Sequence, residues 1–473
     1  MNRNNIWIHI AIAVVVVTLA AVLGQIRRWE NLLNSADTSS SESRSVAIKV
    51  KPAVNTSGEP EVLVRFKPGA SLEDIRRIAE TKNDTVEDEI ESVPGLVAID
   101  DNDNADAEAT AEEYLELEGI VEYAQPNYQI SLDDPSAATL ADALYRSPTG
   151  QPNDPQFGQQ WALNNLGQDG GKERADIDAL KAWLKTRGSD KVVVAVLDTG
   201  VDYTHSDLIT NMWIRPDSVP EYVDDELGSI DDIHGFDADA NAGDPMDDNG
   251  HGTHCAGIIG AEGDNGVGIA GINWNVKIMP LKFLGRGGFG STKNAIESIN
   301  YAIDRKKHGV NIRVINASWG STQYSRALED AIRAAGDEGI LFVAAAGNSS
   351  SDNDKRAHYP SNYNLPNVIS VAALDRTDTL ASFSNFGAKT VHIAAPGRDI
   401  LSTWLGDVYR DASGTSMAAP QVSGVAALIL ASESRISVGK LRERILSSVD
   451  KISTLDGKVA SGGRLNAAKA LGE

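Results

Sequence analysis

The residues that could do chemistry in this chain are a carboxylic acid, an imidazole and a hydroxyl in three short segments far apart. Asp198, His251 and Ser416 lie among small residues, in the segments D-T-G (198–200), H-G-T-H (251–254) and G-T-S-M-A-A-P (414–420). A serine hydroxyl becomes a good nucleophile when an imidazole takes its proton, and a carboxylate fixes the tautomer of that imidazole. Each segment alone is a modest signal, but together they predict a hydrolytic triad.

The histidine segment has a second interpretation, which is a metal site, because His254 follows His251 by three residues. A zinc site needs further Cys or His ligands nearby, and Cys255 alone does not supply them. The triad is therefore the preferred interpretation.

The neighbouring sequence predicts how these residues are positioned. Residues 192–197 form a continuous apolar run, typical of a strand buried on both faces of a parallel sheet, and Asp198 follows at the carboxyl edge where such sheets place their sites. His251 and Ser416 each open a segment with the pattern of a helix rich in small residues. Pro420 is expected in the first helical turn, where proline is tolerated.

A second apolar run, residues 340–346, predicts another buried strand that ends at Gly347 and Asn348. The side-chain amide of Asn348 could donate to an oxyanion together with the backbone N–H of Ser416. The alternative is that Asn348 only forms a turn after glycine. Beside a triad, the oxyanion role is favoured.

From about Asn153 to the C-terminus the chain resembles the subtilisin-like serine proteases, and their thermitase and proteinase K branches in particular. The resemblance rests on four motifs: D-T-G-V-D (198–202), H-G-T-H-C-A-G (251–257), A-A-G-N (345–348) and G-T-S-M-A-A-P (414–420). It implies a doubly wound α/β domain with a mostly parallel sheet, and endopeptidase activity through an acyl-enzyme. One departure is Gln421, where the family usually has histidine.

A glycine-rich stretch at 285–290 fits the dinucleotide-binding pattern G-x-G-x-x-G, but the next predicted strand, 312–317, is not followed by the acidic residue such a site needs. The resemblance implies instead that this stretch is one wall of a substrate cleft, which holds an extended peptide by strand addition. The residues expected to bind substrate are Gly288, Phe289, Gly290, Ser318, Trp319, Gly320, Ala345 and Gly347. Because they are mostly small and uncharged, we expect broad specificity with an apolar or aromatic preference at the first pocket, which His358 near its floor could shift.

The N-terminal part divides by composition into several segments. Residues 1–30 read as a signal peptide or signal anchor, since 6–24 are almost wholly apolar and nearly long enough to span a bilayer. In both cases the enzyme is expected to be exported: a signal peptide would leave it secreted, and a signal anchor would keep it attached to the membrane. A polar linker, 31–60, precedes a small α+β pattern at 61–131 that resembles the inhibitory propeptide of the family. The alternative for 61–131 is an unrelated small domain. Residues 132–152 would be the processing linker and 153–473 the catalytic domain.

Composition indicates which partners to expect. The chain has 473 residues and one cysteine, so an intrachain disulfide is excluded. Its net charge of −24 argues against nucleic acid and for cations or simple solubility. Many acids lie between 224 and 248, and Asp237 and Asp244 are candidate Ca²⁺ ligands there, although a solvated acidic surface would look the same. The resemblance implies a further Ca²⁺ site made by Asp154, Asp207, Gly263, Asn265, Val267 and Ile269.

Two classes of function fit these features. The first is a serine endopeptidase made as a zymogen, which acts on proteins and peptides and has its own propeptide as an intramolecular inhibitor. The second is a catalytically idle, calcium-dependent binding or scaffold module. An intact triad, Asn348 and an intact propeptide favour the first, because an idle scaffold needs none of them.

Overall fold

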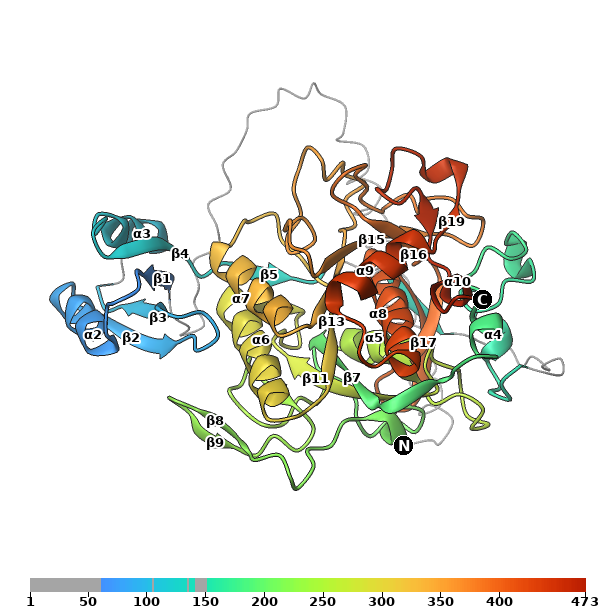
Figure 1. Ribbon diagram of the computed structural model, residues 1–473, viewed down its shortest axis with the longest axis horizontal. Helices are drawn as coiled ribbons and strands as arrows, with labels where there is room; N and C mark the ends of the chain where they lie inside the picture. Colours follow the sequence, from blue (N-terminus) through green and yellow to red (C-terminus); the bar gives the residue numbers. More distant parts are fainter. Residues whose placement is uncertain (1–60, 104–105, 134–135, 141–150) are drawn as a thin grey trace, which may run out of the picture. The chain divides into compact units, whose positions relative to one another are not determined.

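The computed structural model describes residues 61–103, 106–133, 136–140 and 151–473 (Figure 1). The predicted signal segment 1–30, with its apolar stretch 6–24, and the polar linker 31–60 lie outside the described residues.

Residues 61–126 form a small domain with a four-stranded antiparallel sheet in the order β2-β3-β1-β4. Its elements are β1 (Val62–Phe66), α2 (Leu72–Thr81), β2 (Asp84–Glu89), β3 (Leu96–Asp101), α3 (Ala107–Leu115) and β4 (Val121–Pro126). The predicted small α+β pattern is confirmed. The sequence of β2, D-T-V-E-D-E, is mostly acidic and lacks the apolar residues that predict a strand. Buried Asp84 on β2 accepts a hydrogen bond from the Tyr114 hydroxyl at 2.6 Å.

A nine-stranded sheet in the order β10-β11-β7-β13-β14-β15-β16-β20-β19 organises the rest of the chain. All neighbouring strands are parallel except β19 and β20. The strands are β7 (Gly188–Asp198), β10 (Phe236–Asp237), β11 (Asn275–Lys282), β13 (Ile312–Ala317), β14 (Leu341–Ala345), β15 (Val368–Leu374), β16 (Ile393–Pro396), β19 (Asp450–Lys451) and β20 (Gly463–Arg464). Because β11 and β13 flank β7 on opposite sides, the strand order reverses at β7, and the carboxyl edge there is where such sheets bind ligands.

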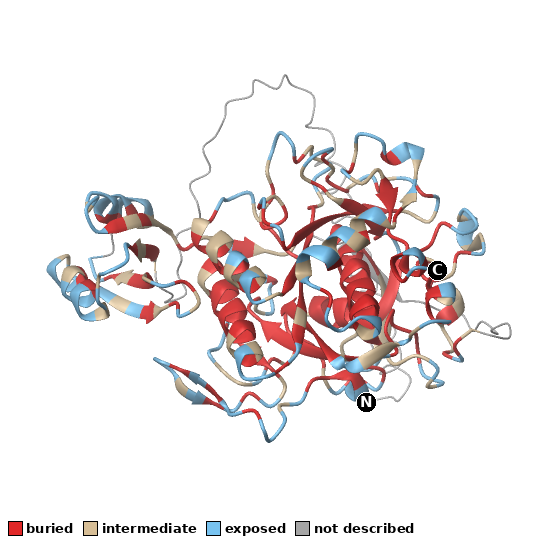
Figure 2. Cartoon of the chain, viewed as in Figure 1, coloured by how far each residue is buried: buried red, intermediate tan, exposed pale blue. Residues whose placement is uncertain are grey.

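Helices cover both faces of this sheet, and the side chains of β7 show it. Val192, Val194 and Val196 belong to the core that also contains α5 (His251–Gly260) and α8 (Thr415–Ser432). Val193 and Leu197 belong to the opposite core, with α6 (Thr292–Lys307) and α7 (Arg326–Asp337). This alternation confirms the predicted doubly wound α/β fold, and Figure 2 shows α8 and the central strands buried along most of their length.

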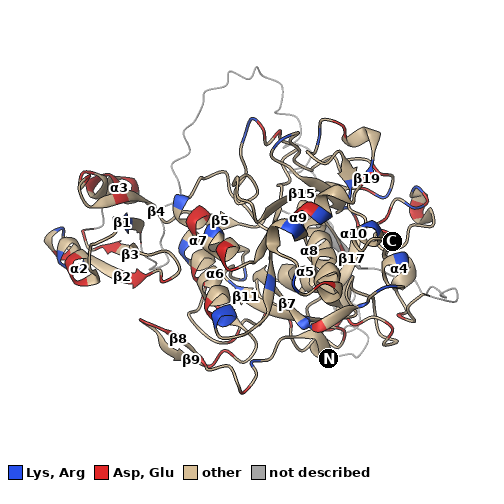
Figure 3. Ribbon diagram, viewed as in Figure 1, with Lys and Arg blue, Asp and Glu red and all other residues tan. Residues whose placement is uncertain are grey.

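The remaining elements lie around these two sheets. They are β5 (Gln129–Ser131), β6 (Ser136–Leu140), β8 (Tyr222–Asp224), β9 (Gly228–Ile230), β12 (Phe289–Ser291), β17 (Ile400–Trp404), β18 (Val408–Ser413), α4 (Ala179–Ala182), α9 (Val438–Ser447) and α10 (Ala467–Ala470). Within the expected processing linker, 132–152, β6 pairs antiparallel with β18, so part of this segment is a strand. Figure 3 shows acidic residues on α2, α3 and the segment of β8 and β9.

The position of Pro420 differs from the expectation. Because α8 begins at Thr415, the proline lies beyond the first turn, where it cannot donate to the carbonyl four residues earlier, that of Ser416. The Ser416 carbonyl accepts instead from Ser318 Oγ at 2.8 Å and from Cys255 Sγ at 3.5 Å. These two donors replace the missing backbone bond. Among the described residues, α8 is also the helix long and apolar enough to cross a membrane, but 89% of it is buried inside the protein, as expected of a core helix.

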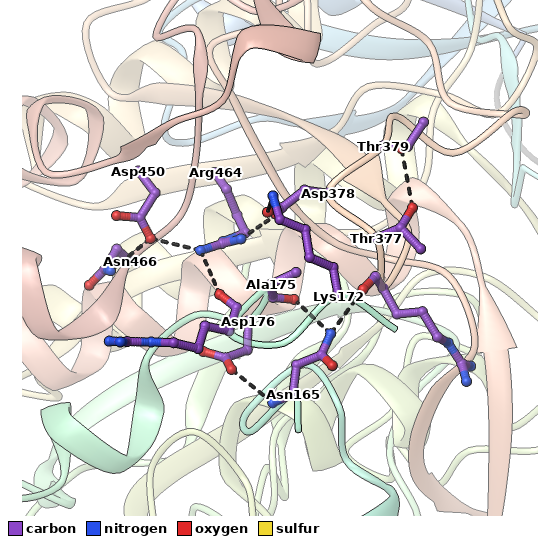
Figure 4. A network of polar contacts seen from close by, with 12 residues as sticks. Asn165, Lys172, Ala175, Asp176, Thr377, Asp378, Thr379, Asp450, Arg464 and Asn466 are labelled. Carbon is purple, nitrogen blue, oxygen red and sulfur yellow. Dashed lines mark hydrogen bonds and ion pairs between the residues drawn. The ribbon is translucent and has the colours of Figure 1, made fainter. Parts of the chain in front are cut away.

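A buried ion-pair network holds the C-terminal strands (Figure 4). Arg464 on β20, whose side chain is 6% exposed, contacts the carboxylates of Asp378 and Asp450, and it donates to the carbonyl of Arg174 at 3.1 Å. Asp378 also pairs with Lys172 at 3.1 Å, although the Lys172 side chain is 61% exposed. The buried Arg464 side chain therefore joins three chain segments.

Arg464→Met should lower the free energy of unfolding by about 3–5 kcal/mol, because it leaves the buried Asp378 carboxylate without its main partner. Lys172→Met, which removes the exposed partner of the same carboxylate, should cost at most about 1 kcal/mol. Urea unfolding of both variants in a Ser416→Ala background measures the difference. Equal losses would contradict the role given to Arg464.

Candidate active site

Asp198 and His251 meet where the end of β7 contacts the start of α5. Asp198 is the last residue of β7, His251 is the first of α5, and His251 Nδ1 lies 2.7 Å from Asp198 Oδ1. The close approach requires glycine at position 252, because a Cβ there would overlap the carbonyl oxygen of Gly200. The geometry thus follows from a strand end and a helix start that small residues bring into contact.

The electrostatics of this pair suit a general base. Asp198 and His251 are both buried, and burial alone would lower the pKa of His251, but the charge and hydrogen bond of Asp198 outweigh it, so the pKa is raised above 6.5. With the proton of the neutral imidazole on Nδ1, directed to the carboxylate, Nε2 carries the lone pair. Nε2 has no hydrogen-bond partner among the described residues, so it is available to take a proton.

Ser416 is the second residue of α8. Its hydroxyl donates to the carbonyl of Ser318 at 3.0 Å, and the Ser318 hydroxyl donates back to the carbonyl of Ser416 at 2.8 Å. Cys255, one turn after His251 on α5, donates its thiol to the same carbonyl of Ser416. The structure thus brings the three predicted triad residues to one small region at the carboxyl edge of the sheet.

The alternative metal interpretation finds little support here. Asp198, His251 and Cys255 place possible ligand atoms within 4.8 Å of one another. Burial, however, raises the pKa of the Cys255 thiol, which therefore stays protonated, whereas metals bind the thiolate. His254 points elsewhere, with Nε2 3.0 Å from the carbonyl oxygens of Ile400 and Arg410, and burial lowers the pKa of this imidazole to about 3.

Asn348 is oriented by its neighbours. Its Oδ1 accepts from the backbone N–H of Thr415 at 2.8 Å and from the Thr415 hydroxyl at 2.9 Å, which leaves Nδ2 directed away from this residue. Nδ2 is buried and has no partner in the described part of the chain. A Cβ placed at Gly414 would lie 3.2 Å from Nδ2 and 3.5 Å from the Ser416 nitrogen. The Asn348 Nδ2 group and the Ser416 N–H therefore both lie beside the position that a Cβ at residue 414 would occupy, and glycine leaves that position empty.

The tail of the small domain lies along the predicted cleft walls. Residues 129–131 pair antiparallel with β12, Ser131 bridges to Gly320, and the Leu132 N–H donates to the Gly288 carbonyl at 2.9 Å. The glycine-rich stretch thus pairs with a peptide strand. The side chain of Trp319 does not line the cleft, because it is buried and its Nε1 donates to the Leu197 carbonyl at 2.8 Å.

The other predicted cleft residues differ in their exposure to solvent and in their neighbours. Phe289 is 55% exposed, whereas Ala345 is wholly buried within β14. Gly347, in the left-handed region at φ +104°, lies against the imidazole of His358.

Comparison with known proteins identifies the family. Residues 189–467 match the subtilase family, and residues 58–127 match the fervidolysin N-terminal prodomain. The chain belongs to the subtilase family. It is 36% identical over 411 residues to the "Thermophilic serine proteinase" of Bacillus sp. (strain AK1), with 87% of each chain covered. It is 37% identical over 320 residues to thermitase of Thermoactinomyces vulgaris, covering 68% of this chain and 99% of thermitase.

The solved structures agree on the fold. Fervidolysin from Fervidobacterium pennivorans superposes with a TM-score of 0.68 at 24% identity, over 88% of this chain and 61% of that chain. The predicted subtilisin-like fold, the serine-protease class and the prodomain are therefore confirmed.

In this subtilase, the residues expected to bind Ca²⁺ fall into one group around the loop 263–269. Asp207 is buried and accepts from Asn265 Nδ2 at 2.9 Å and from the Ile269 N–H at 3.0 Å. Asp154 accepts from the Asp264 N–H at 2.7 Å, while its Oδ1 is buried without a partner among the described residues. Burial raises the pKa of Asp154 to about 6 and that of Asp207 to about 7. Two buried carboxylates that lack a positive partner fit a cation.

The other members of this predicted set occupy the same loop. Val267 donates its N–H to Asn265 Oδ1 at 2.7 Å and is 37% exposed. Gly263 packs on the ring of Trp274 so closely that a Cβ would lie 2.6 Å from it. The loop thus has a fixed shape that side-chain and ring contacts maintain.

Asp237 and Asp244, the candidate Ca²⁺ ligands before His251, have different hydrogen-bond partners. Asp237 accepts from the N–H groups of Asp239 and Ala240 in its own loop, whereas Asp244 accepts from the hydroxyl of Tyr203, a residue of a more distant segment, at 2.8 Å. Burial raises the pKa of Asp237 to about 6.

Sequence reasoning missed the structural role of Asp247. Its carboxylate accepts from the hydroxyl groups of Thr199 and Thr253, at 2.9 and 2.6 Å, and from the backbone N–H groups of Gly250 and Thr253. It therefore satisfies free N–H groups at the start of α5 and ties them to the end of β7. An aspartate just before a helix is the signal that could have revealed it.

Proposed function

We propose that this subtilase is the zymogen of an exported serine endopeptidase that cleaves peptide bonds through an acyl-enzyme. The observation that carries the proposal is the pair Asp198–His251, whose Nδ1 is held at 2.7 Å while Nε2 stays without a partner among the described residues. Ser416 is the nucleophile, His251 the general base, and Asp198 orients the imidazole and stabilises its charged form.

The chemical steps follow from these roles. Ser416 Oγ bonds to the carbonyl carbon of the substrate as its proton passes to His251 Nε2, and the carbonyl oxygen becomes an oxyanion. Asn348 Nδ2 and the Ser416 N–H donate to that oxygen. The C–N bond then breaks, and His251 gives its proton to the departing amine. Water hydrolyses the acyl-enzyme with His251 again as base, which restores the Ser416 hydroxyl.

The small domain is proposed to inhibit the enzyme until it is removed. Its tail lies along the cleft, and its sheet is tied to the catalytic part by Arg65–Asp330 at 2.6 Å and Lys293–Asp88 at 2.8 Å. We assign 61–131 to this inhibitory propeptide, place the maturation cut within 132–152, and assign 153–473 to the catalytic domain. While the tail occupies the substrate strand position, other peptides are excluded.

The specificity and the location of the enzyme are also part of the proposal. The small residues of the cleft walls support broad specificity with an apolar or aromatic preference at the first pocket, which the imidazole of His358 near its floor would shift. Export is supported by the apolar stretch 6–24, with Arg27 and Arg28 after it, and leads to a secreted or a membrane-anchored enzyme.

Calcium is proposed to stabilise the catalytic domain. Asp154, Asp207 and Asn265, with backbone carbonyl groups of Gly263, Val267 and Ile269, would hold one ion, and the orphaned Asp154 Oδ1 supports this. The cation would offset the burial of two carboxylates, and it has no catalytic role. Asp237 and Asp244 are candidates for a second ion.

A fluorophosphonate probe should label Ser416 in the processed enzyme, because the probe needs an activated serine. The labelling rate should fall on the acid side with an apparent pKa above 6.5, since His251 must be neutral to act as base and its pKa is raised. Asp198→Asn should lower that pKa and slow labelling by up to about 10⁴-fold. Mass spectrometry locates the label, with exposed Ser434→Ala as a control that keeps it. An unlabelled protein would indicate the idle binding module instead.

Asn348→Leu should lower kcat by about 10²–10³-fold with KM nearly unchanged, the loss known for such a donor in subtilisin, a member of this family. The physical reason is that the amide contacts the oxyanion only in the transition state. Steady-state kinetics on one peptide substrate measures both constants. A change confined to KM would make Asn348 a turn residue without a catalytic role.

Removing calcium should lower the melting temperature of Ser416→Ala protein, which cannot digest itself. A ligand that binds only the native state adds about 2.7 kcal/mol at a hundredfold excess over Kd. Asp207→Asn should abolish the difference between millimolar calcium and EDTA, whereas exposed Asp217→Asn should keep it. An unfolding temperature that is the same in both buffers would mean that these carboxylates bind no ion.

A further inference from the structure

We infer that His358 shifts the preference at the first substrate pocket toward an acidic residue, so that the protease cleaves after aspartate or glutamate as well as after apolar residues. The inference rests on the proposed function of the cleft and adds its substrate class. His358 is 6% exposed, and neither ring nitrogen has a hydrogen-bond partner among the described residues. Its polar neighbour is a carboxylate of the propeptide tail, Asp133, whose Oδ2 lies 3.1 Å from His358 Nε2 at ion-pair distance, without the alignment of a hydrogen bond.

Two glycines fix the place of the imidazole. A Cβ at Gly320 would overlap the His358 ring, and a Cβ at Gly347 would lie 2.9 Å from it. Gly320 belongs to one wall of the cleft, and Gly347 follows the strand that ends beside Asn348. The imidazole therefore lies between the residues that the sequence assigns to the first pocket.

The register of the tail shows which substrate position faces this imidazole. Ser131 bridges antiparallel to Gly320, and the Leu132 N–H donates to the Gly288 carbonyl. Because the two segments run in opposite directions, Asp133, two residues after Ser131, comes opposite Ser318, two residues before Gly320. Ser318 is the residue whose carbonyl accepts the Ser416 hydroxyl at 3.0 Å. Asp133 is thus the tail residue beside the nucleophile, with its side chain toward His358.

The chemistry of the pocket favours a carboxylate over an apolar group. Asp133 Oδ2 is buried, and a buried carboxylate without a donor is costly, whereas His358 can offer an N–H from Nε2 or a full positive charge. A leucine or phenylalanine in the same place would bring neither a charge nor an acceptor to that nitrogen. A lysine would bring no acceptor at all.

The same register identifies the bond presented for self-cleavage. Ser416 would attack the carbonyl carbon of Asp133, and the bond to the nitrogen of residue 134 would break. After hydrolysis Asp133 carries a new carboxylate, and residue 134 carries a new amine. This bond lies within the segment 132–152, where processing is expected.

The test compares three peptides that differ only at the residue before the scissile bond, which is Asp, Asn or Leu. Processed enzyme should cleave the Asp peptide at least about tenfold faster in kcat/KM than the Asn peptide, as a hydrogen bond to a charged group provides. His358→Leu should bring that ratio close to one while the Leu peptide is still cleaved. His358→Gln, which keeps a neutral donor, should give an Asp-to-Asn ratio between that of the wild type and that of His358→Leu. A wild-type ratio near one, or the same ratio in His358→Leu, overturns the inference.

The zymogen gives an independent measurement that needs no change at His358. Intact mass should show a propeptide fragment that ends at Asp133, Asp133→Lys should be processed far more slowly than Asp133→Asn, and Ser416→Ala should stay uncut. A fragment with another end, or equal processing of Asp133→Lys, overturns the inference. If Ser416 reacts with a fluorophosphonate and the Leu peptide is cleaved, only the acidic preference has failed. If neither occurs, the proposed protease activity itself has failed.

Discussion

The site depends on how the first turn of α8 is attached to the end of β13. Pro420 has no N–H to donate to the Ser416 carbonyl. The Ser318 hydroxyl donates to that carbonyl instead, and the Ser318 carbonyl accepts from the Ser416 hydroxyl. Behind them, Asn316 Nδ2 donates to Ser318 Oγ and Ser423 Oγ donates to Asn316 Oδ1, both at 2.9 Å. A buried network in which each member is satisfied is rigid, so the nucleophile is held by the strand that also borders the substrate.

The contact between α8 and the end of β13 links Ser416 to the residues that pair with a peptide strand. The Ser318 carbonyl accepts the hydroxyl of Ser416, the proposed nucleophile, and two residues later Gly320 pairs with the backbone of the propeptide tail. Any extended chain that pairs with both walls is therefore set at a fixed register relative to Ser416. Backbone pairing supplies affinity that is independent of sequence, and selectivity is left to the few side chains that enter pockets. The imidazole proposed at the floor of one pocket would then select among the side chains that this pairing presents there.

The sequence predicted what depends on local pattern. The apolar run before Asp198, the small residues around His251 and Ser416, and the alternating strands of the small domain each have a local physical cause, so the fold and the grouping of candidate catalytic residues could be predicted. What could not be predicted depends on contacts between distant segments. The acidic strand β2 is held by its pairing with β3, and Asp247 acts through two threonines on other elements. The contact of Asp133 with His358 joins residues more than two hundred positions apart, and no local pattern indicates it.

The place of the proposed cut also bears on what remains with the catalytic part. Residues 136–140 pair with β18, and β17 pairs with β18 in turn, so β6 completes a three-stranded sheet on the catalytic side. A cut far into the segment 132–152 would remove this strand, whereas a cut after Asp133 keeps it. It also keeps Asp154 joined to this strand, and the Asp154 carboxylate accepts from the Asp264 N–H in the loop 263–269. The proposed cut after Asp133 would thus free the propeptide and keep the pairing of β6 with β18.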